Sequence, residues 1–256
     1  MSYQLSPAFE HYRQRAAQGL EPVPSHTQVV AWLRAHRAEF AELIAGGRNA
    51  GKIVYDFGSD NAEIPFGGDS DPWTAASRMF AQFAAAGAVL GVGRYRERRA
   101  CYNAPQFAAA GGEARSVHLG IDLFAPAGTP LYAPLAGRVH SYADNALPLD
   151  YGPTIILEHQ PEPGLRFYTL YGHLARESLA GLEVDQPFSA GAELARIGDP
   201  AVNGGWIPHV HFQIILDLLG CRGDFPGAGQ PSLWALWESL CPDPNLILGL
   251  PEAVAA

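Results

Sequence analysis

Residues 208–216 read Pro-His-Val-His-Phe-Gln-Ile-Ile-Leu, a run that predicts a β-strand with two different faces. Successive side chains of a strand point to opposite faces. The apolar face then consists of Val210, Phe212 and Ile214. His209 and His211 share the other face, about 6.6 Å apart at about 3.3 Å per residue. The apolar face is explained by a hydrophobic core, whereas the paired histidines need a second explanation.

The sequence before this strand has the residue pattern of an antiparallel β domain. From Val117 onward, short apolar runs alternate with Gly/Pro turns and the helical period disappears. The other predicted strands are Leu131–Tyr142, Pro153–His159, Leu165–Tyr171 and Glu193–Ile197. The whole chain contains 28 glycines and 21 prolines, which fits a turn-rich β protein. We therefore expect a mainly β fold, with antiparallel strands in two packed sheets over residues 116–217.

Helical patterns flank this β domain. Residues 1–48 form a predicted helical region, with Ser6-Pro7 opening one helix and a Ser25/Gln28 capping box opening a second that ends at Gly46-Gly47. Residues 49–115 form a mixed extension with a short strand from Lys52 and a helix capped at Asp71-Pro72. Residues 218–256 carry a short helix at Leu233–Leu240 and a tail.

The charge and the local patterns of the sequence argue against nucleic-acid and membrane partners. The formal net charge is −9, which argues against a nucleic-acid partner. The most apolar stretch, Ala75–Gly93, is interrupted by Arg78 and Gln82, so no membrane span is predicted. The N-terminus lacks the pattern of a secretory signal, and the expected location is cytoplasmic. Cys101, Cys221 and Cys241 lie far apart and predict free thiols.

A second histidine-containing segment predicts a metal site together with the paired histidines. Residues 118–122 read His-Leu-Gly-Ile-Asp. In a straight strand His118 and Asp122 would lie about 13 Å apart, too far to share an ion whose ligands lie about 2 Å from it. Gly120 permits the bend that is needed. Bent in this way, His118, Asp122 and one histidine of the pair make three ligands with an open fourth position, which is typical of catalytic zinc.

A third motif places another histidine at the end of a strand. In Leu-Tyr-Gly-His-Leu, residues 170–174, alternation predicts that Tyr171 and His173 share one face. A histidine there suits a general base or a donor to an oxyanion. The remaining histidines are interpreted as structural or solvent-exposed; they are His11, His26, His36, His140 and His159.

Taken together, these motifs resemble the catalytic domain of lysostaphin/LytM-type zinc metallopeptidases, many of which cut peptidoglycan cross-links. The resemblance covers about residues 115–217. It rests on five segments in order: His118–Asp122; Ala125–Pro134 followed by Gly137–Val139; Leu170–Leu174; Val184–Gly191 followed by Ile197-Gly198; and Pro208–Phe212.

The resemblance implies a function and a role for each site residue. His118, Asp122 and His211 would bind one Zn²⁺ ion, His173 and His209 would flank the activated water, and Tyr171 would orient the oxyanion. The implied fold is similar to that of duplicated-hybrid-motif proteins. The implied activity is zinc-dependent amide hydrolysis, with a peptide or a peptidoglycan fragment as substrate.

Several segments depart from the family pattern, and some of their residues are candidates for binding the substrate. The approach to the last motif, residues 203–208, is not the usual Ser/Thr-Gly segment, so Asn203 and Trp206 are candidate substrate contacts. Gln213 stands where an acidic residue is frequent in the family. Arginines 94, 96, 98 and 99 form the one basic cluster of an acidic chain, and Arg94 is a candidate contact for a substrate carboxylate.

Two functions from other classes stay open. One is a non-catalytic relative that binds and regulates another protein through the same groove. The other is a histidine phosphocarrier of related fold, which would need no metal. Asp122 and the His-x-His pair favour zinc over the carrier. The sequence leaves the oligomeric state undetermined.

Overall fold

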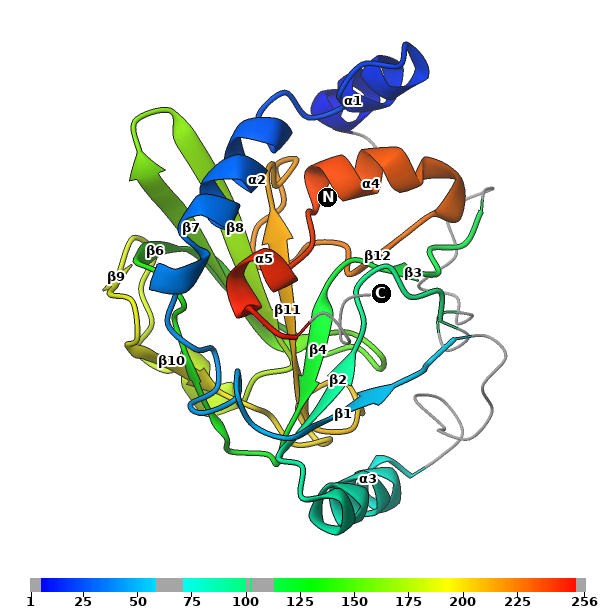
Figure 1. Cartoon of the computed structure of the whole chain (residues 1–256), viewed down its shortest axis with the longest axis vertical. Coiled ribbons are helices and arrows are strands. Elements are labelled where there is room, and N and C mark those ends of the chain that lie inside the picture. Colours follow the sequence, from blue (N-terminus) through cyan, green and yellow to red (C-terminus); the bar gives the residue numbers. More distant parts are fainter. Residues whose placement is uncertain (1–5, 59–70, 100–101, 103–112, 252–256) are drawn as a thin grey trace.

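An eight-stranded sheet forms the centre of the computed structural model, which describes residues 6–58, 71–99, 102 and 113–251 (Figure 1). Its strands pair antiparallel, except that β1 runs parallel to β2. In spatial order they are β1 (Lys52–Tyr55), β2 (Leu90–Gly93), β4 (Ile121–Phe124), β11 (His209–Ile215), β8 (Leu165–Gly172), β7 (Gly152–Glu162), β6 (Gly137–Asn145) and β9 (Pro187–Phe188).

Two small sheets complete the β structure. β10 (Glu193–Arg196) pairs with β5 (Pro130–Tyr132), and β12 (Ala228–Gly229) pairs with β3 (Val117–His118). The predicted mainly β class is confirmed. Its strands are distributed as one large sheet and two short pairs, and the large sheet extends past the β domain because β1 and β2 of the preceding segment join the edge of β4.

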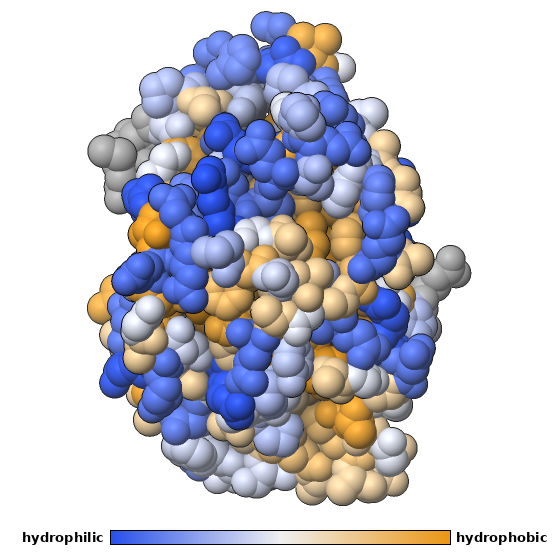
Figure 2. All heavy atoms as spheres, turned by 90° about the vertical axis from the view of Figure 1, so that its left-hand side faces the viewer, coloured by the Kyte–Doolittle hydropathy of each residue, from blue (hydrophilic) through white to orange (hydrophobic). Residues whose placement is uncertain are grey.

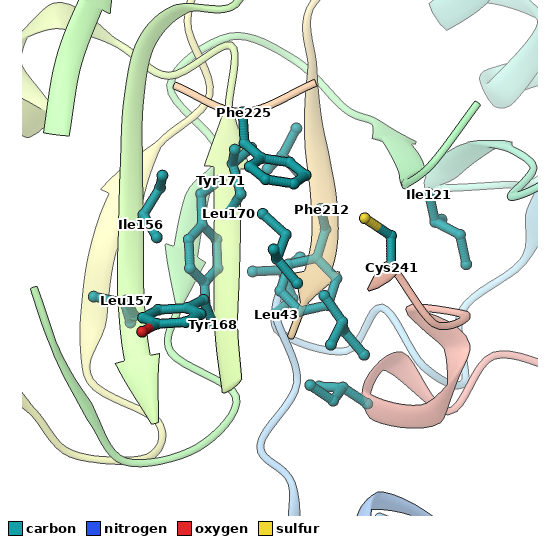
Figure 3. Packing of buried hydrophobic residues seen from close by; sticks show 14 of the residues in the cluster. Leu43, Ile121, Ile156, Leu157, Tyr168, Leu170, Tyr171, Phe212, Phe225 and Cys241 are labelled. Atoms are coloured by element: carbon teal, nitrogen blue, oxygen red, sulfur yellow. The ribbon is translucent and has the colours of Figure 1, made fainter. Parts of the chain in front are cut away.

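β11 lies between β4 and β8, and both of its faces are buried. As the alternation predicts, Phe212 faces the hydrophobic core, where its ring lies 5.4 Å from that of Tyr171 (Figure 3). Burying a phenylalanine side chain contributes about 1.5–3 kcal/mol to folding. The histidine face is buried as well, so the paired histidines lie inside the protein.

Within the described ranges, five helices flank the sheets. They are α1 (Pro7–Ala17), α2 (His26–Ala35), α3 (Pro72–Ala86), α4 (Trp234–Leu240) and α5 (Asn245–Leu248). The first two helices pack against the last two, because α1 contacts α4 and α2 contacts α5 (Figure 1). Phe9 of α1 and Trp237 of α4 form one such contact, with ring centroids 5.5 Å apart.

Most predicted helix boundaries are confirmed. α1 begins at Pro7 directly after Ser6, and α3 is capped by Asp71, whose carboxylate accepts a hydrogen bond from the Thr74 backbone N–H at 2.9 Å. α4 matches the predicted C-terminal helix within one residue. The short α5 follows Pro244, in a segment whose sequence predicts no helix.

The predicted start of α2 is confirmed, because the helix begins at His26 directly after Ser25. The predicted capping box and the predicted end are wrong: Ser25 makes no side-chain cap, and the helix stops at Ala35 rather than near Gly46. After a short 3₁₀ turn at Arg37–Glu39, the chain is tied to the β domain: the Ala41 N–H donates to the Pro134 carbonyl and the Leu43 carbonyl accepts from the Tyr132 N–H. These tertiary hydrogen bonds override the helical spacing of residues 40–44 while leaving their apolar side chains buried.

The surface contains both hydrophilic and hydrophobic residues. On the face shown in Figure 2, hydrophilic residues dominate and hydrophobic patches lie between them. Among the described residues, no helix has the combination of length and apolarity that a bilayer crossing needs. Cys221 and Cys241 are free thiols, as predicted, whereas Cys101 lies outside the described residues.

Candidate metal centre

Three side chains from distant parts of the sequence converge on one point. His118 Nε2 lies 3.0 Å from His211 Nδ1 and 3.2 Å from Asp122 Oδ1, and the last two atoms lie 3.1 Å apart. Ligand atoms bound tetrahedrally to zinc at 2.0–2.1 Å are about 3.3–3.4 Å apart. All three residues are buried. The triangle therefore has a size and a donor set that could hold a metal ion.

The backbone explains how these ligands meet. His118 ends β3, the chain bends at Gly120, and Asp122 lies on β4 directly opposite His211 of β11. The predicted bend at Gly120 is confirmed. A Cβ atom at this position would lie 2.5 Å from His211 Cε1, so the absence of a side chain also makes room for the imidazole.

Hydrogen bonds fix which nitrogen of each histidine faces the cluster. His118 Nδ1 lies 2.8 Å from the Arg94 carbonyl oxygen and must donate to it, which leaves the lone pair on Nε2. His211 Nε2 lies 2.9 Å from Gln213 Oε1, which leaves the lone pair of His211 on Nδ1. Both lone pairs lie in the triangle, and partners of this kind orient metal-binding histidines in proteins.

Electrostatics favours the protonation states that metal ligands need. Burial, followed by the nearby Arg99 guanidinium, lowers the pKa of His118 to about 3. Burial opposes ionisation of Asp122, but the neighbouring His118 and Arg99 outweigh it and hold the pKa of this carboxyl well below its ordinary value. A neutral imidazole and a carboxylate are the forms that bind a metal ion.

Two further histidines line the same centre. His209 Nε2 lies 3.8 Å from Asp122 Oδ1, and the rings of His209 and His173 are 4.2 Å apart. Their Nδ1 atoms bond to backbone carbonyls, His209 to Ile207 at 2.7 Å and His173 to Asn203 at 2.9 Å. Burial lowers the pKa of His209 to about 4 and that of His173 well below its ordinary value. Both rings are therefore neutral near pH 7 and can accept a proton at Nε2.

Tyr171 is not brought to this cluster, so the predicted shared face with His173 is wrong. Tyr171 pairs with Phe212 on the core side of the sheet, and its hydroxyl bonds to that of Thr169 at 3.0 Å. The reason is local: His173 has a φ of +62°, so the chain turns at the end of β8 and alternation stops there.

A tyrosine that the sequence analysis missed takes the place beside the histidines. The ring of Tyr151 lies 5.4 Å from that of His173 and 5.2 Å from that of His211. Its hydroxyl is 3.4 Å from His211 Nε2. Tyr151 directly precedes β7 and belongs to none of the recognised motifs, so only its position next to a predicted strand could have drawn attention to it.

The three candidate substrate contacts lie near the centre in different settings. Asn203 is fully buried. Its side-chain amide accepts a hydrogen bond from the Trp206 backbone N–H and donates one to the Trp206 carbonyl, which holds the loop 203–206 in place. Trp206 is buried, and its indole N–H donates to the Asp150 carbonyl at 3.2 Å. Arg94 is partly exposed and forms ion pairs with Asp56 and Glu97. Of the three, Arg94 alone offers an exposed charged group.

Comparison with solved structures returned several peptidases. A zinc-containing peptidase from Vibrio cholerae shares 26% identity over 40% of this chain and 28% of its own, with a TM-score of 0.32. The catalytic domain of the antimicrobial peptidase lysostaphin from Staphylococcus simulans shares 23% identity over 47% of this chain and 80% of its own, with a TM-score of 0.34. This chain thus spans little more than a quarter of the Vibrio protein.

Sequence comparison identifies the family of the β domain. No match was found among curated protein sequences. The profile of Peptidase family M23 matches residues 116–219, which contain the three clustered ligands and both neighbouring histidines. This agrees with the resemblance found in the sequence motifs. Residues 116–219, named the M23 domain after this match, are therefore similar to peptidase family M23.

Proposed function

We propose that the protein is a zinc-dependent peptidase that hydrolyses amide bonds with an activated water. The observation that carries this proposal is the buried triangle of His118, Asp122 and His211, whose donor atoms lie 3.0–3.2 Å apart. Three protein ligands leave a fourth position for water or substrate, which is the arrangement of catalytic zinc sites.

The ion and the protein would divide the chemistry. Zinc held by these residues would supply Lewis acidity, bringing the pKa of a coordinated water to about 7 and polarising a peptide carbonyl. His209 is neutral, and its Nε2 lies within 3.8 Å of the Asp122 carboxylate, which stabilises the imidazolium once a proton arrives. We assign His209 as the general base for the attacking water.

His173 and Tyr151 would complete the reaction. His173 stacks near His209 with ring centroids 4.2 Å apart, so it can share the proton and return it to the leaving amine. Tyr151 lies against both His173 and His211 and offers a hydroxyl to the oxyanion, the role first expected of Tyr171.

The proposed substrate is a peptide or a peptidoglycan-type cross-link. Support comes from the family of the domain and from Arg94, whose partly exposed guanidinium suits a substrate carboxylate. A regulatory relative without catalysis has no physical need for neutral histidines placed beside three ligands, and this favours an enzyme over a binding domain.

Metal analysis combined with peptide hydrolysis tests the proposal. The purified protein is expected to contain one zinc per chain and to cut short glycine- or alanine-containing peptides or cell-wall fragments. His118→Ala removes a ligand and is expected to abolish both metal binding and hydrolysis. His209→Ala is expected to keep the metal and lose hydrolysis. His11→Ala, at an exposed position on α1, is the matched control. Protein that binds no zinc after loading would refute the proposal.

A further inference from the structure

A buried arginine outside the M23 domain holds one of the three ligands. Arg99 Nη1 donates to Asp122 Oδ2 at 2.6 Å, and both side chains are 1% exposed. The other carboxylate oxygen, Oδ1, faces His118 and His211. One carboxylate oxygen of Asp122 therefore accepts a hydrogen bond from the arginine, and the other faces the candidate metal centre.

The arginine is itself held in a closed setting. Its Nε donates to Glu97 Oε2 at 2.9 Å, and Nη1 also lies 3.2 Å from the Tyr102 hydroxyl. The guanidinium carbon lies 5.1 Å from the centre of the Phe57 ring. A Cβ atom on Gly93 would lie 2.6 Å from Nη2, so the glycine of β2 makes room for the guanidinium. The side-chain partners named here other than Asp122 are Phe57, Glu97 and Tyr102, and they precede the M23 domain.

Stability alone does not account for this arrangement. Desolvating an arginine and a carboxylate is costly, and well-packed apolar side chains often serve a protein interior equally well. Glu97 brings a second buried carboxylate to the same guanidinium, which offsets its positive charge. The guanidinium therefore acts on Asp122 both through a fixed hydrogen bond and through its charge, and Glu97 offsets part of that charge toward a nearby cation.

We propose that Arg99 is a positioning residue of the metal centre. By taking Oδ2, it restricts Asp122 to one-oxygen coordination through Oδ1 and keeps the next coordination position open for water or substrate. This inference rests on the proposed zinc site. The segment before the M23 domain would then supply the hydrogen-bond donor that orients Asp122.

Arg99→Met in the full-length protein tests the proposal, with Arg98→Met as the control. Arg98 is the adjacent residue and its side chain is exposed, so the two variants lose the same charge. Zinc affinity is measured by competition with a chromophoric chelator, and X-ray absorption counts the oxygen and nitrogen neighbours of the bound zinc. Arg99→Met is expected to bind zinc about 10–100-fold more weakly, as is typical when a partner of a metal ligand is lost. It is also expected to gain one oxygen neighbour, whereas Arg98→Met stays at the wild-type values.

A double variant separates positioning from charge. Glu97→Gln combined with Arg99→Met removes both compensating charges, which avoids an unpaired buried Glu97, and is expected to show the same extra oxygen neighbour. Wild-type affinity or tighter binding in Arg99→Met, with an unchanged number of neighbours, would overturn the positioning role and leave the zinc site intact. Failure of the wild-type protein to bind zinc would instead overturn the zinc site and this inference together.

Discussion

Gln213 fixes the orientation of His211, a proposed metal ligand, so Gln213→Leu is expected to weaken both folding and metal binding. The side chain is fully buried. Its Nε2 donates to the Pro226 carbonyl at 3.2 Å and to Cys241 Sγ at 3.3 Å, which turns Oε1 toward His211 Nε2 at 2.9 Å. Leucine has a similar size but neither donates nor accepts.

The structure sets the size of the effect. The substitution leaves the His211 N–H and the Pro226 carbonyl without their partner, at about 1–3 kcal/mol each. The Tyr151 hydroxyl, 3.4 Å from His211 Nε2, can accept the N–H after a small shift. The expected loss of stability in the metal-free protein is therefore about 2–4 kcal/mol. A loss of about 10–100-fold in zinc affinity, equal to about 1.4–2.8 kcal/mol, adds to it when zinc is present.

Urea unfolding with a chelator and with saturating zinc separates the two effects. The chelator series gives the folding loss, and the additional loss in zinc gives the change in affinity. Gln160→Leu, at an exposed position on β7, is the matched control and is expected to change stability by less than about 0.5 kcal/mol. A folded Gln213→Leu protein with wild-type zinc affinity would refute the orienting role of the amide.

Three other predictions follow from the same structure. Gly120→Ala is expected to displace the His211 ring and lower the zinc content, as measured by metal analysis. Tyr151→Phe is expected to keep zinc affinity while hydrolysis falls about 10²–10³-fold, the usual cost of losing an oxyanion donor; unchanged turnover would contradict that role. Burial lowers the pKa of His159 to about 4, so the unfolded chain binds a proton that the folded protein rejects between about pH 6.5 and 4. The free energy of unfolding therefore decreases as the pH is lowered from about 6.5 to 4, by up to about 3 kcal/mol. His159→Gln is expected to flatten the pH dependence of urea unfolding.

The parts of the site that were predictable depend on local chain geometry. Alternation along 209–215 placed the apolar side chains in the core and the histidines together on the other face. The distance between His118 and Asp122 in a straight strand required a bend, and Gly120 was the residue that allowed it. These inferences needed only rises per residue and the absence of a side chain, so the sequence was sufficient.

The parts that were missed depend on contacts between distant segments. Tyr151 reaches the centre because its loop folds beside β8, where its carbonyl accepts the His173 N–H. Tyr171 was predicted on the wrong face because the residue type of His173 does not indicate its positive φ, which ends the alternation of side chains. The end of α2 was placed too far along because hydrogen bonds to the β domain replace its last turns. None of these features has a local sequence pattern.

The partners of the three proposed ligands have a consequence for how the protein would acquire a metal ion. They extend from the Arg94 carbonyl to Cys241, which holds the amide of Gln213, so the site draws on most of the chain. Such long-range closures are slow compared with helix formation. Zinc capture during refolding is therefore expected to coincide with the last kinetic phase, and a fluorescent zinc indicator in a stopped-flow instrument would record the moment at which the native topology is complete.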